Sequence, residues 1–297
     1  MLNPKHLASL VAIADHGTFA AAGTAIGRSH SAVSLHIKAL EDALGCLLVD
    51  RAARPVELTP DGAALVEQAR RLTRVLDDIR MIGRSDRLAG PLSVGVVPSA
   101  MVHIAPPALA DLNRTHPALS LSIRTGLSGE LAQAVGVGDL DAAVLTGPDL
   151  APDDLALQVV ADEPLVVIAP ADAAGTDDAA LLSTHPFIWF NRTTWAGQQI
   201  ERRLLDRGIA TRTAMEVDSL EAIEALVRHG LGVSIVPDHW GDGPPEGLRI
   251  LPFGTPQARR RLVLATRPKS PRQRAIEALL TALRGASEPK CIAVTEA

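Results

Sequence analysis

The chain has 297 residues, of which 47% are hydrophobic and 21% are charged, a composition that excludes a disordered or low-complexity protein. The formal net charge is −5 and is uneven: there are eleven Lys and Arg against ten Asp and Glu through residue 90, and 18 against 24 after it. The slight basic excess at the amino end has the sign that nucleic-acid binding requires, but binding would have to come from individually placed cations.

The cysteine content and the hydropathy of the sequence indicate the cellular compartment in which the protein is expected. The two cysteines, Cys46 and Cys291, lie far apart and without metal-ligand spacing, which excludes a disulfide framework and is typical of a reducing cytoplasm. The apolar run after Lys5 imitates an export signal, but Asp15 and His16 interrupt it and an amphipathic helix fits better. No apolar run approaches the roughly 20 residues that span a bilayer. We therefore expect a cytoplasmic protein of two or three compact units, with no membrane partner.

The first 45 residues contain three stretches with the apolar spacing of helices. The second and third, within residues 18–45, are joined by a tight turn, which is the pattern of a helix-turn-helix. In the third stretch Val33, Ile37, Leu40 and Leu44 form one apolar stripe. The predicted helix caps are Asn3, Thr18 and Ser29, and the predicted helix ends are Gly17, Gly27 and Gly45.

The opposite face of the third helix carries small, hydrogen-bonding or cationic side chains. Such side chains contact base edges and phosphates when a helix enters a major groove. On periodicity alone, an ordinary solvated helix hairpin is an equally good interpretation. The candidate DNA-binding residues here are Thr18, Arg28, Ser29, His30, Ser31, Ser34, Leu35 and Lys38.

Two short strand-like runs, LLVD and VELT, flank residues 51–55 and predict a hairpin, or wing, after the third helix. We expect Arg51 and Arg54 of this hairpin to lie along the DNA backbone. The alternative is that both arginines are solvated loop charges.

A long helix is predicted from Thr59-Pro60-Asp61 to about Leu88. Its apolar side chains recur every seven residues with others between them, which is the spacing of a coiled-coil seam. Because such a seam on a single helix needs a partner, we expect this helix to pair two subunits. The candidate dimerisation residues are Leu65, Leu72, Val75, Ile79 and Ile82.

Gly90-Pro91 breaks the long helix and marks a domain boundary. Beyond it, strands and helices alternate in two successive sets, which favours mostly parallel sheets with helices on both faces. Residues 155–160 and 164–169 are predicted as two separate strands, and the last helix is expected from Pro271 to about Arg284.

Ligands of such folds bind where strands end and helices begin. Several of these turns carry hydroxyl groups or exposed backbone N–H groups, which favours a small carboxylate or similar anion. The alternative for Ser99, Ser128 and Ser219 is a helix cap, and Asp218 would repel an anion. The candidate effector-binding residues are Ser99, Ala100, Met101, Ser128, Gly129, Thr146, Gly147, Thr194, Trp195, Asp218 and Ser219.

The order of residues carries a resemblance to a known family. The runs TFAAAGTAIG, SHSAVS, LEDALG and LLVDR, and later VDSLEAIEALVRHGLGVSIVP, resemble motifs of LysR-type transcriptional regulators. His30 stands where the family usually has Gln at the head of its recognition helix, a change that bears on the target sequence. Val49 stands where the family usually has Phe. The resemblance covers about residues 2–285.

The resemblance implies three parts, listed in chain order: a winged helix-turn-helix domain over 1–59, a dimerising linker helix over 60–89, and a two-lobed α/β effector-binding domain, similar to periplasmic binding proteins, over 90–297. Lobe I would comprise about 91–160 and 267–285, and lobe II about 162–265. The implied crossings between the lobes lie near Ala161–Asp162 and Thr266–Arg267.

The function that the resemblance implies is transcriptional regulation without a cofactor. Such a protein binds double-stranded promoter DNA as a dimer or a dimer of dimers, and a small-molecule effector between the lobes modulates that binding. RNA polymerase is a further candidate partner. The redox-sensing cysteine pair of one branch of this family is missing from the second half of the chain.

Two other classes of function remain open: a two-lobed solute-binding module that is dimerised by its amino-terminal helices, and an α/β enzyme with an appended helical domain. The sequence has no Gly-x-Ser-x-Gly motif, no complete phosphate loop and no full dinucleotide fingerprint. We expect no catalytic residues and no metal site. Neither alternative accounts for the order of residues from Thr18 to Arg51.

Overall fold

A computed structural model describes residues 2–53, 55–81, 88–150, 152–240 and 245–287 of the chain. The residues form two compact units, 1–86 and 87–297, and each unit is described by itself. No helix among the described residues is long and apolar enough to cross a membrane.

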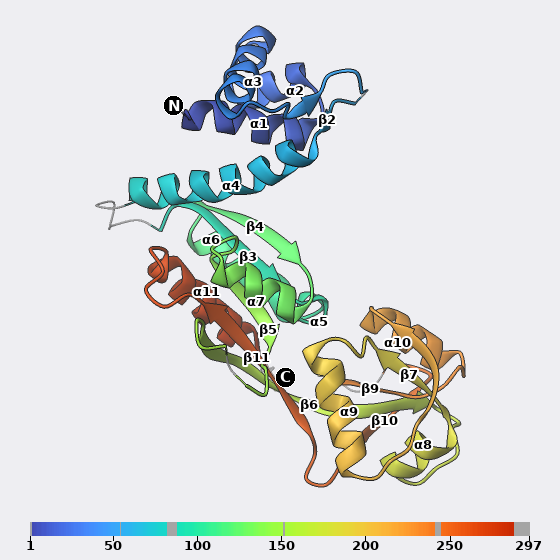
Figure 1. The fold of residues 1–297 in the computed structure, drawn as a ribbon. Coiled ribbons are helices and arrows are strands. Elements are labelled where there is room, and N and C mark those ends of the chain that lie inside the picture. The colour runs from blue at the N-terminus through green and yellow to red at the C-terminus, as the bar shows by residue number, and fades with distance from the viewer. Residues whose placement is uncertain (1, 54, 82–87, 151, 241–244, 288–297) are drawn as a thin grey trace, which may run out of the picture. The chain divides into compact units, whose positions relative to one another are not determined.

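The amino-terminal unit is a three-helix bundle followed by a small hairpin and a long helix (Figure 1). The predicted wing is present, because β1 and β2 pair antiparallel with Val49 opposite Leu58. The elements are α1 (Pro4–His16), α2 (Phe19–Ala25), α3 (His30–Leu44), β1 (Val49–Asp50), β2 (Glu57–Leu58) and α4 (Pro60–Met81).

The predicted helix caps form as expected. The three helices begin where a side-chain oxygen accepts a backbone N–H, and they are followed by glycines with positive φ, which glycine adopts without steric penalty. The cap bonds are Lys5 N–H to Asn3 at 2.9 Å, Ala21 N–H to Thr18 at 3.1 Å and Ala32 N–H to Ser29 at 3.2 Å. The φ angles of Gly17, Gly27 and Gly45 are 68°, 64° and 71°.

The core of this unit joins α3 to α1 and α4. Val33 and Ile37 of the predicted stripe are fully buried, and Val66 and Ala69 of α4 close the same core. Leu44 departs from the expectation, since it is 42% exposed at the last turn of α3. At that turn the chain leaves the helix through Gly45, so the stripe ends one turn early.

The carboxy-terminal unit contains two lobes. The first is built on parallel strands, β4-β3-β5, with helices packed around them and one large apolar core. Its elements are β3 (Gly90–Val96), α5 (Pro98–Met101), α6 (Ala105–Thr115), β4 (Leu119–Thr125), α7 (Ser128–Gly136), β5 (Ala142–Thr146) and α11 (Gln273–Ser287).

Two long strands connect the lobes, and here the structure corrects the sequence analysis. The residues expected as two strands form one continuous strand, β6 (Ala156–Pro170), that runs from the first lobe into the second (Figure 1). β11 (Arg259–Thr266) brings the chain back and already pairs with β5 from Leu262 onward. The return therefore lies before Leu262 and not near Thr266–Arg267, because hydrogen bonding to β5 places these residues in the first lobe.

The second lobe surrounds the far end of β6. Its apolar side chains lie in two clusters on either side of the strands, one containing Phe187 and Phe253 and the other Ile188 and Ile223. Its elements are α8 (Asp178–Thr184), β7 (Pro186–Phe190), α9 (Trp195–Asp206), β8 (Arg212–Val217), α10 (Leu220–Arg228), β9 (Ser234–Pro237) and β10 (Leu248–Pro252).

The expectation of mostly parallel sheets is wrong. Parallel pairing occurs in β3 with β4, β3 with β5 and β7 with β8, whereas β6 and β11 pair antiparallel with their neighbours in the sheet. The reason is that β6 carries the chain from the first lobe into the second and β11 carries it back, so these two strands run in opposite directions beside each other. Alternation of strands and helices alone does not reveal this.

Candidate DNA-binding surface and effector site

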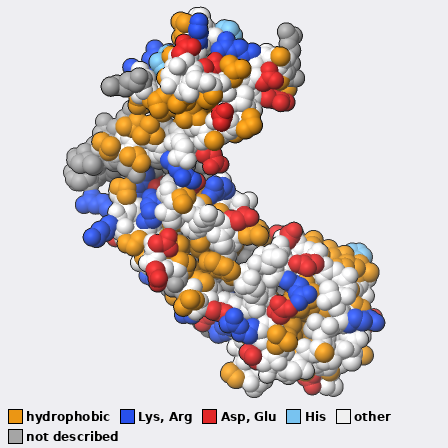
Figure 2. Space-filling model, viewed as in Figure 1, with side chains coloured by type: hydrophobic (Ala, Val, Ile, Leu, Met, Phe, Trp, Pro, Cys, Tyr) orange, Lys and Arg blue, Asp and Glu red, His pale blue; other side chains and the backbone are white. Residues whose placement is uncertain are grey.

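The exposed face of α3 carries the predicted DNA-contacting side chains. His30, Ser31 and Lys38 are exposed, and Leu35 is 67% exposed. Ser34 is half-buried. An exposed leucine on such a face can contact a thymine methyl group in a major groove. Lys, Arg and His side chains gather at this end of the unit (Figure 2).

The first turn of α3 is fixed by local hydrogen bonds. The Ser29 hydroxyl caps the helix and lies 3.0 Å from the Ser31 hydroxyl. Gly23, which the sequence analysis did not single out, lets α2 approach this turn closely. A Cβ at Gly23 would lie 2.7 Å from the carbonyl oxygen of Arg28, nearer than real Cβ atoms approach. The glycine therefore sets how α2 meets the turn that positions α3.

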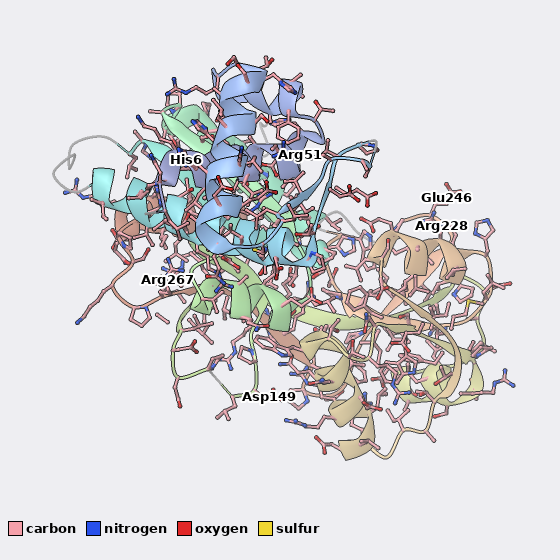
Figure 3. The ribbon with its side chains drawn as sticks, turned by 45° about the horizontal axis from the view of Figure 1, so that its top comes forward. His6, Arg51, Asp149, Arg228, Glu246 and Arg267 are labelled. Atoms are coloured by element: carbon pink, nitrogen blue, oxygen red, sulfur yellow. The ribbon has the colours of Figure 1, made fainter. Side chains whose placement is uncertain are left out.

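The wing arginine is tied to the domain. Arg51, which is labelled in Figure 3, lies 3.3 Å from Glu41 of α3 and its guanidinium lies 5.6 Å from the centroid of the Phe19 ring. Phe19 in turn packs against the His30 ring at a centroid distance of 5.6 Å. Arg51 thus keeps one charge at the edge of α3. Arg54, for which a contact with the DNA backbone is predicted, lies outside the described residues.

The apolar side chains of the predicted coiled-coil seam on α4 are largely exposed to solvent. Leu72, Val75 and Ile79 are 40%, 52% and 55% exposed, whereas Leu65 packs partly against the helical core. Three large apolar side chains at heptad-like spacing on one exposed helix resemble half of a helix pair. Ile82 lies outside the described residues.

In the carboxy-terminal unit, Ser99 at the start of α5 contacts a charged group from the far end of the chain. Its hydroxyl accepts a hydrogen bond from Arg260 Nη1 at 3.0 Å. Arg260 Nε donates to Glu163 Oε2 at 2.6 Å, and His103 Nε2 lies 2.9 Å from Glu163 Oε1. Ser99, Glu163 and Arg260 are 3%, 5% and 4% exposed. A buried polar cluster therefore lies where β6 and β11 leave the first lobe.

Burial and nearby charge act in opposite directions on the pKa of Glu163 in this cluster. Burial raises the pKa of Glu163, but the charge of Arg260 and the hydrogen bonds from Arg260 and His103 outweigh it, so the pKa lies below its usual value.

The His103 ring stacks on His239 at a centroid distance of 5.2 Å, and His239 Nε2 lies 3.2 Å from Glu224. Burial raises the pKa of Glu224.

Arg260, Glu163 and His103 are not among the site residues that the sequence predicts. A signal for Arg260 exists in the run Arg259-Arg260-Arg261, because side chains alternate between faces along a strand and the middle one points opposite to its neighbours. Arg260 is buried, whereas its two neighbours are exposed. Nothing in the local sequence identifies Glu163 as its partner.

The other candidate effector residues lie at strand ends and helix starts of both lobes. Thr194 and Ser219 act as helix caps, accepting the N–H groups of Gly197 and Ala222. Ser128 is buried but makes no cap bond. Asp218 accepts a hydrogen bond from Asn191 at 2.6 Å. Ala100 and Thr146 are buried, Met101 is half-buried, and the Trp195 indole nitrogen lies 3.9 Å from the position of a Cβ built on Gly129.

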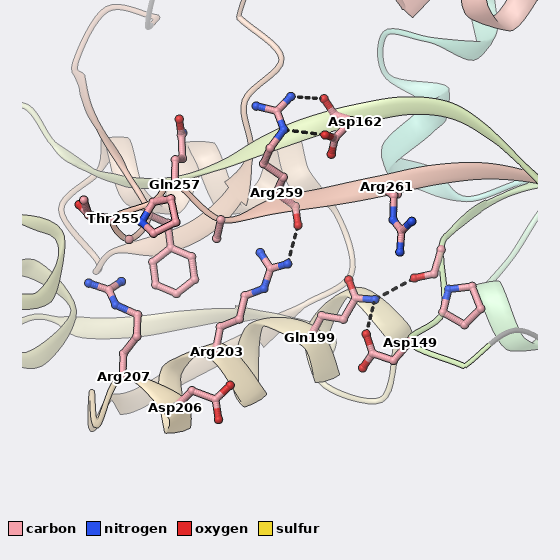
Figure 4. A pocket seen from close by; sticks show the side chains of 16 residues that line it. Asp149, Asp162, Gln199, Arg203, Asp206, Arg207, Thr255, Gln257, Arg259 and Arg261 are labelled. Atoms are coloured by element: carbon pink, nitrogen blue, oxygen red, sulfur yellow. Dashed lines mark hydrogen bonds and ion pairs between the residues drawn. The ribbon is translucent and has the colours of Figure 1, made fainter.

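A separate polar groove of about 610 Å³ lies beside α9 and the loop before β11 (Figure 4). Gly147 lines this groove and accepts a hydrogen bond from Gln199 at 2.8 Å. Arg203 donates to the carbonyl of Arg259 at 2.6 Å, and Arg259 pairs with Asp162 at 2.8 Å. Because its lining contains four arginines and three aspartates, its charges largely balance.

Comparison with known families covers nearly the whole chain. The model described as a bacterial regulatory helix-turn-helix protein of the LysR family matches residues 4–63, and the model described as a LysR substrate binding domain matches residues 85–288.

Several proteins are similar to this chain over most of their length. The hydrogen peroxide-inducible genes activator of Pectobacterium carotovorum subsp. carotovorum is 27% identical over 308 residues, covering 95% of this chain and 96% of the relative. The DNA-binding transcriptional dual regulator OxyR of Escherichia coli K12 is 28% identical over 311 residues and 95% of each chain.

Solved structures agree in fold. A cysteine-to-aspartate variant of full-length OxyR from Pseudomonas aeruginosa has a TM-score of 0.72 and 29% identity, covering 97% of each chain. Full-length CbnR in complex with its target DNA has a TM-score of 0.71 at 21% identity, covering 96% of this chain and 99% of that one.

Proposed function

The chain belongs to the LysR family of bacterial transcriptional regulators, and from that premise we propose that it binds promoter DNA through paired α3 helices under the control of a small anion bound between its two lobes. The observation that carries this proposal is the joint presence of an exposed α3 face and a buried polar cluster, containing Arg260 and Ser99, at the lobe boundary. We propose no catalytic activity, which is supported by the regulators among its relatives.

Self-association is part of the proposal. The exposed Leu72, Val75 and Ile79 would pair two α4 helices and thereby hold two α3 helices at a fixed separation. Contacts between carboxy-terminal units would then build a dimer of dimers, and bound promoter DNA would present the complex to RNA polymerase. Effector binding would act by favouring one arrangement of the lobes, which requires different affinities for the two arrangements.

The response is expected to differ from peroxide sensing by a thiol. Some relatives are named hydrogen peroxide-inducible activators. This chain has no cysteine between Cys46 and Cys291, so no thiol in the intervening residues is available for oxidation. For that part of the chain we propose reversible binding of a ligand instead.

The test uses the full chain and its own upstream DNA. A library of small acids is first screened for compounds that raise the thermal unfolding midpoint. Footprints and DNA bending are then compared with and without a compound that binds. The proposal expects a changed footprint or bend, whereas identical patterns at saturating compound would contradict it.

A further inference from the structure

Two histidine rings stack beside the exposed face of α3. The ring centroids of His6 on α1 and His36 on α3 lie 4.5 Å apart, and the angle between the ring planes is 21°. His36 is half-buried, and it follows Leu35 of the exposed face. The histidine pair therefore borders the surface that is proposed to enter the DNA groove.

Basic side chains lie on both sides of α3. Arg51 of the wing lies 3.3 Å from Glu41, which follows His36 by five positions and is therefore about 140° around the helix from it. His6 and Arg51 accordingly lie on different sides of α3 (Figure 3). A helix in a major groove has a phosphate backbone on either side, because the groove is only about 12 Å wide. When Arg51 borders one backbone, the histidine pair borders the other.

Hydrogen bonds assign the proton of the neutral His36 ring to Nδ1. The buried Ser9 hydroxyl donates to the carbonyl of Lys5 at 3.1 Å. Its oxygen lies 2.7 Å from His36 Nδ1 and accepts the N–H of that nitrogen, because the hydroxyl hydrogen is already used. His36 Nε2 has no hydrogen-bond partner among the described residues and is not enclosed by them. The ring thus has one free nitrogen that can take up a proton and then donate a hydrogen bond.

The ionisable groups that face His36 are basic. They are Lys5 and His6 from α1 and Arg28 from the turn before α3, and α2 contains no ionisable side chain. On α3 itself, the positions three and four residues away are uncharged: Ala32, Val33, Ala39 and Leu40. Burial lowers the pKa of His36 below its usual value of 6.5, and the charges of the three basic neighbours lower it further. The ring is therefore neutral at pH 7 when no DNA is bound.

A DNA phosphate would reverse this balance. Each backbone phosphate carries a negative charge, which would offset the repulsion among Lys5, Arg28 and a protonated ring. The protonated Nε2 could then donate a charge-assisted hydrogen bond to a phosphate oxygen. Because the free protein lacks this proton, protonation and DNA binding would be linked.

We propose that His36 Nε2 takes up a proton when α3 binds DNA and donates to a backbone phosphate that Lys5 and Arg28 also contact. The inference rests on the proposed function and adds a phosphate contact and a pH dependence to the α3 surface. Since the bound protein holds more protons than the free protein, affinity rises as the pH falls. The rise ends below the pKa of the free ring, where His36 is charged in both states.

The test is calorimetric titration of the full chain with its upstream DNA at pH 7, at constant ionic strength, in two buffers of different ionisation enthalpy. The comparison gives the number of protons taken up on binding. We expect at least about half a proton for each α3, and an affinity about ten-fold higher at pH 6.5 than at pH 8. Binding without proton uptake, or with proton release, would overturn the proposal.

Variants locate the proton. His36→Gln keeps a polar side chain that cannot be charged, and it should remove at least about half of the uptake. His229→Gln, which alters an exposed histidine of the other unit, should leave the uptake unchanged. At pH 8.5 both variants should bind the DNA as tightly as the wild type, which shows that they are folded. Wild-type uptake in a folded His36→Gln protein would contradict the assignment.

Ser9→Ala provides the test if His36→Gln does not fold. This substitution removes the acceptor of the Nδ1–H group and makes the doubly protonated ring less favourable, while alanine is compatible with the interior of α1. The proton uptake should therefore fall, and unchanged uptake would contradict the assignment.

The same titrations separate the two proposals. Binding of the upstream DNA without proton uptake would overturn this inference alone. Failure of the wild-type protein to bind the DNA at any pH would instead contradict the proposed function.

Discussion

Arg260 and Glu163 lie directly opposite each other on β11 and β6, joined by a 2.6 Å hydrogen bond at the point where the two strands leave the first lobe. Both side chains are more than nine-tenths buried. The two strands that connect the lobes are therefore held together by a charge pair that is buried from solvent. Removing one member leaves the other buried and uncompensated.

Glu163→Gln is expected to destabilise the protein by about 3–5 kcal/mol at neutral pH, since Arg260 would lose its counter-charge. The pKa of Glu163 is lowered on folding, so its stabilising contribution is present above the usual value of 4.5 and is lost as the pH falls through the folded-state pKa. When thermal unfolding is measured from pH 7 downward, the difference in stability between Glu163→Gln and the wild type should become smaller as the pH falls. Glu277→Gln, on the exposed face of α11, is the control, and a pH-independent difference would contradict the assignment.

Gly62→Ala should destabilise the amino-terminal unit by about 1–3 kcal/mol, the usual range for overpacking. A Cβ at Gly62 would lie 2.0 Å from the carbonyl oxygen of Leu48, so α4 would have to move away from the segment just before β1. Gly285→Ala in α11 is the matched control, because nothing lies within 4 Å of its Cβ and helix propensity favours alanine. Chemical denaturation of both variants measures the difference, and equal stabilities would rule out the close approach.

Leu72→Asp combined with Ile79→Asp should reduce the mass of the particle in solution, because charges at the seam of a helix pair remove its apolar contact. Sedimentation equilibrium at micromolar concentration is the measurement. Leu205→Asp on α9 provides the control, since Leu205 is 73% exposed outside the seam. An unchanged mass in the double variant would show that α4 does not pair subunits.

Local features were accessible from the sequence because they depend on neighbours along the chain. The caps at Thr18 and Ser29 and the end of α3 at Gly45 involve residues within four positions of one another. The residue order from Thr18 to Arg51 identified the family for the same reason.

Features made by distant segments were not accessible. Arg260 and Glu163 are 97 positions apart, and their pairing follows from the register of two strands that cross between lobes. The same pairing of β6 with β11 makes β6 one continuous strand and brings the chain back into the first lobe before Leu262. The sequence predicts serines at strand-to-helix turns. It does not predict that the charged partner of Ser99 is Arg260, which lies near the other end of the same domain.

Footprinting of the upstream DNA at low salt tests the central claim most directly. The wild-type chain is expected to protect two half-sites separated by a whole number of helical turns, and Lys38→Ala should weaken protection at both about ten-fold and reduce the salt dependence by about one ion for each α3. Arg114→Ala, which removes an exposed cation from the other unit, should leave the footprint unchanged. A folded Lys38→Ala protein with the wild-type footprint and affinity would contradict the assignment of α3 as the DNA-binding helix.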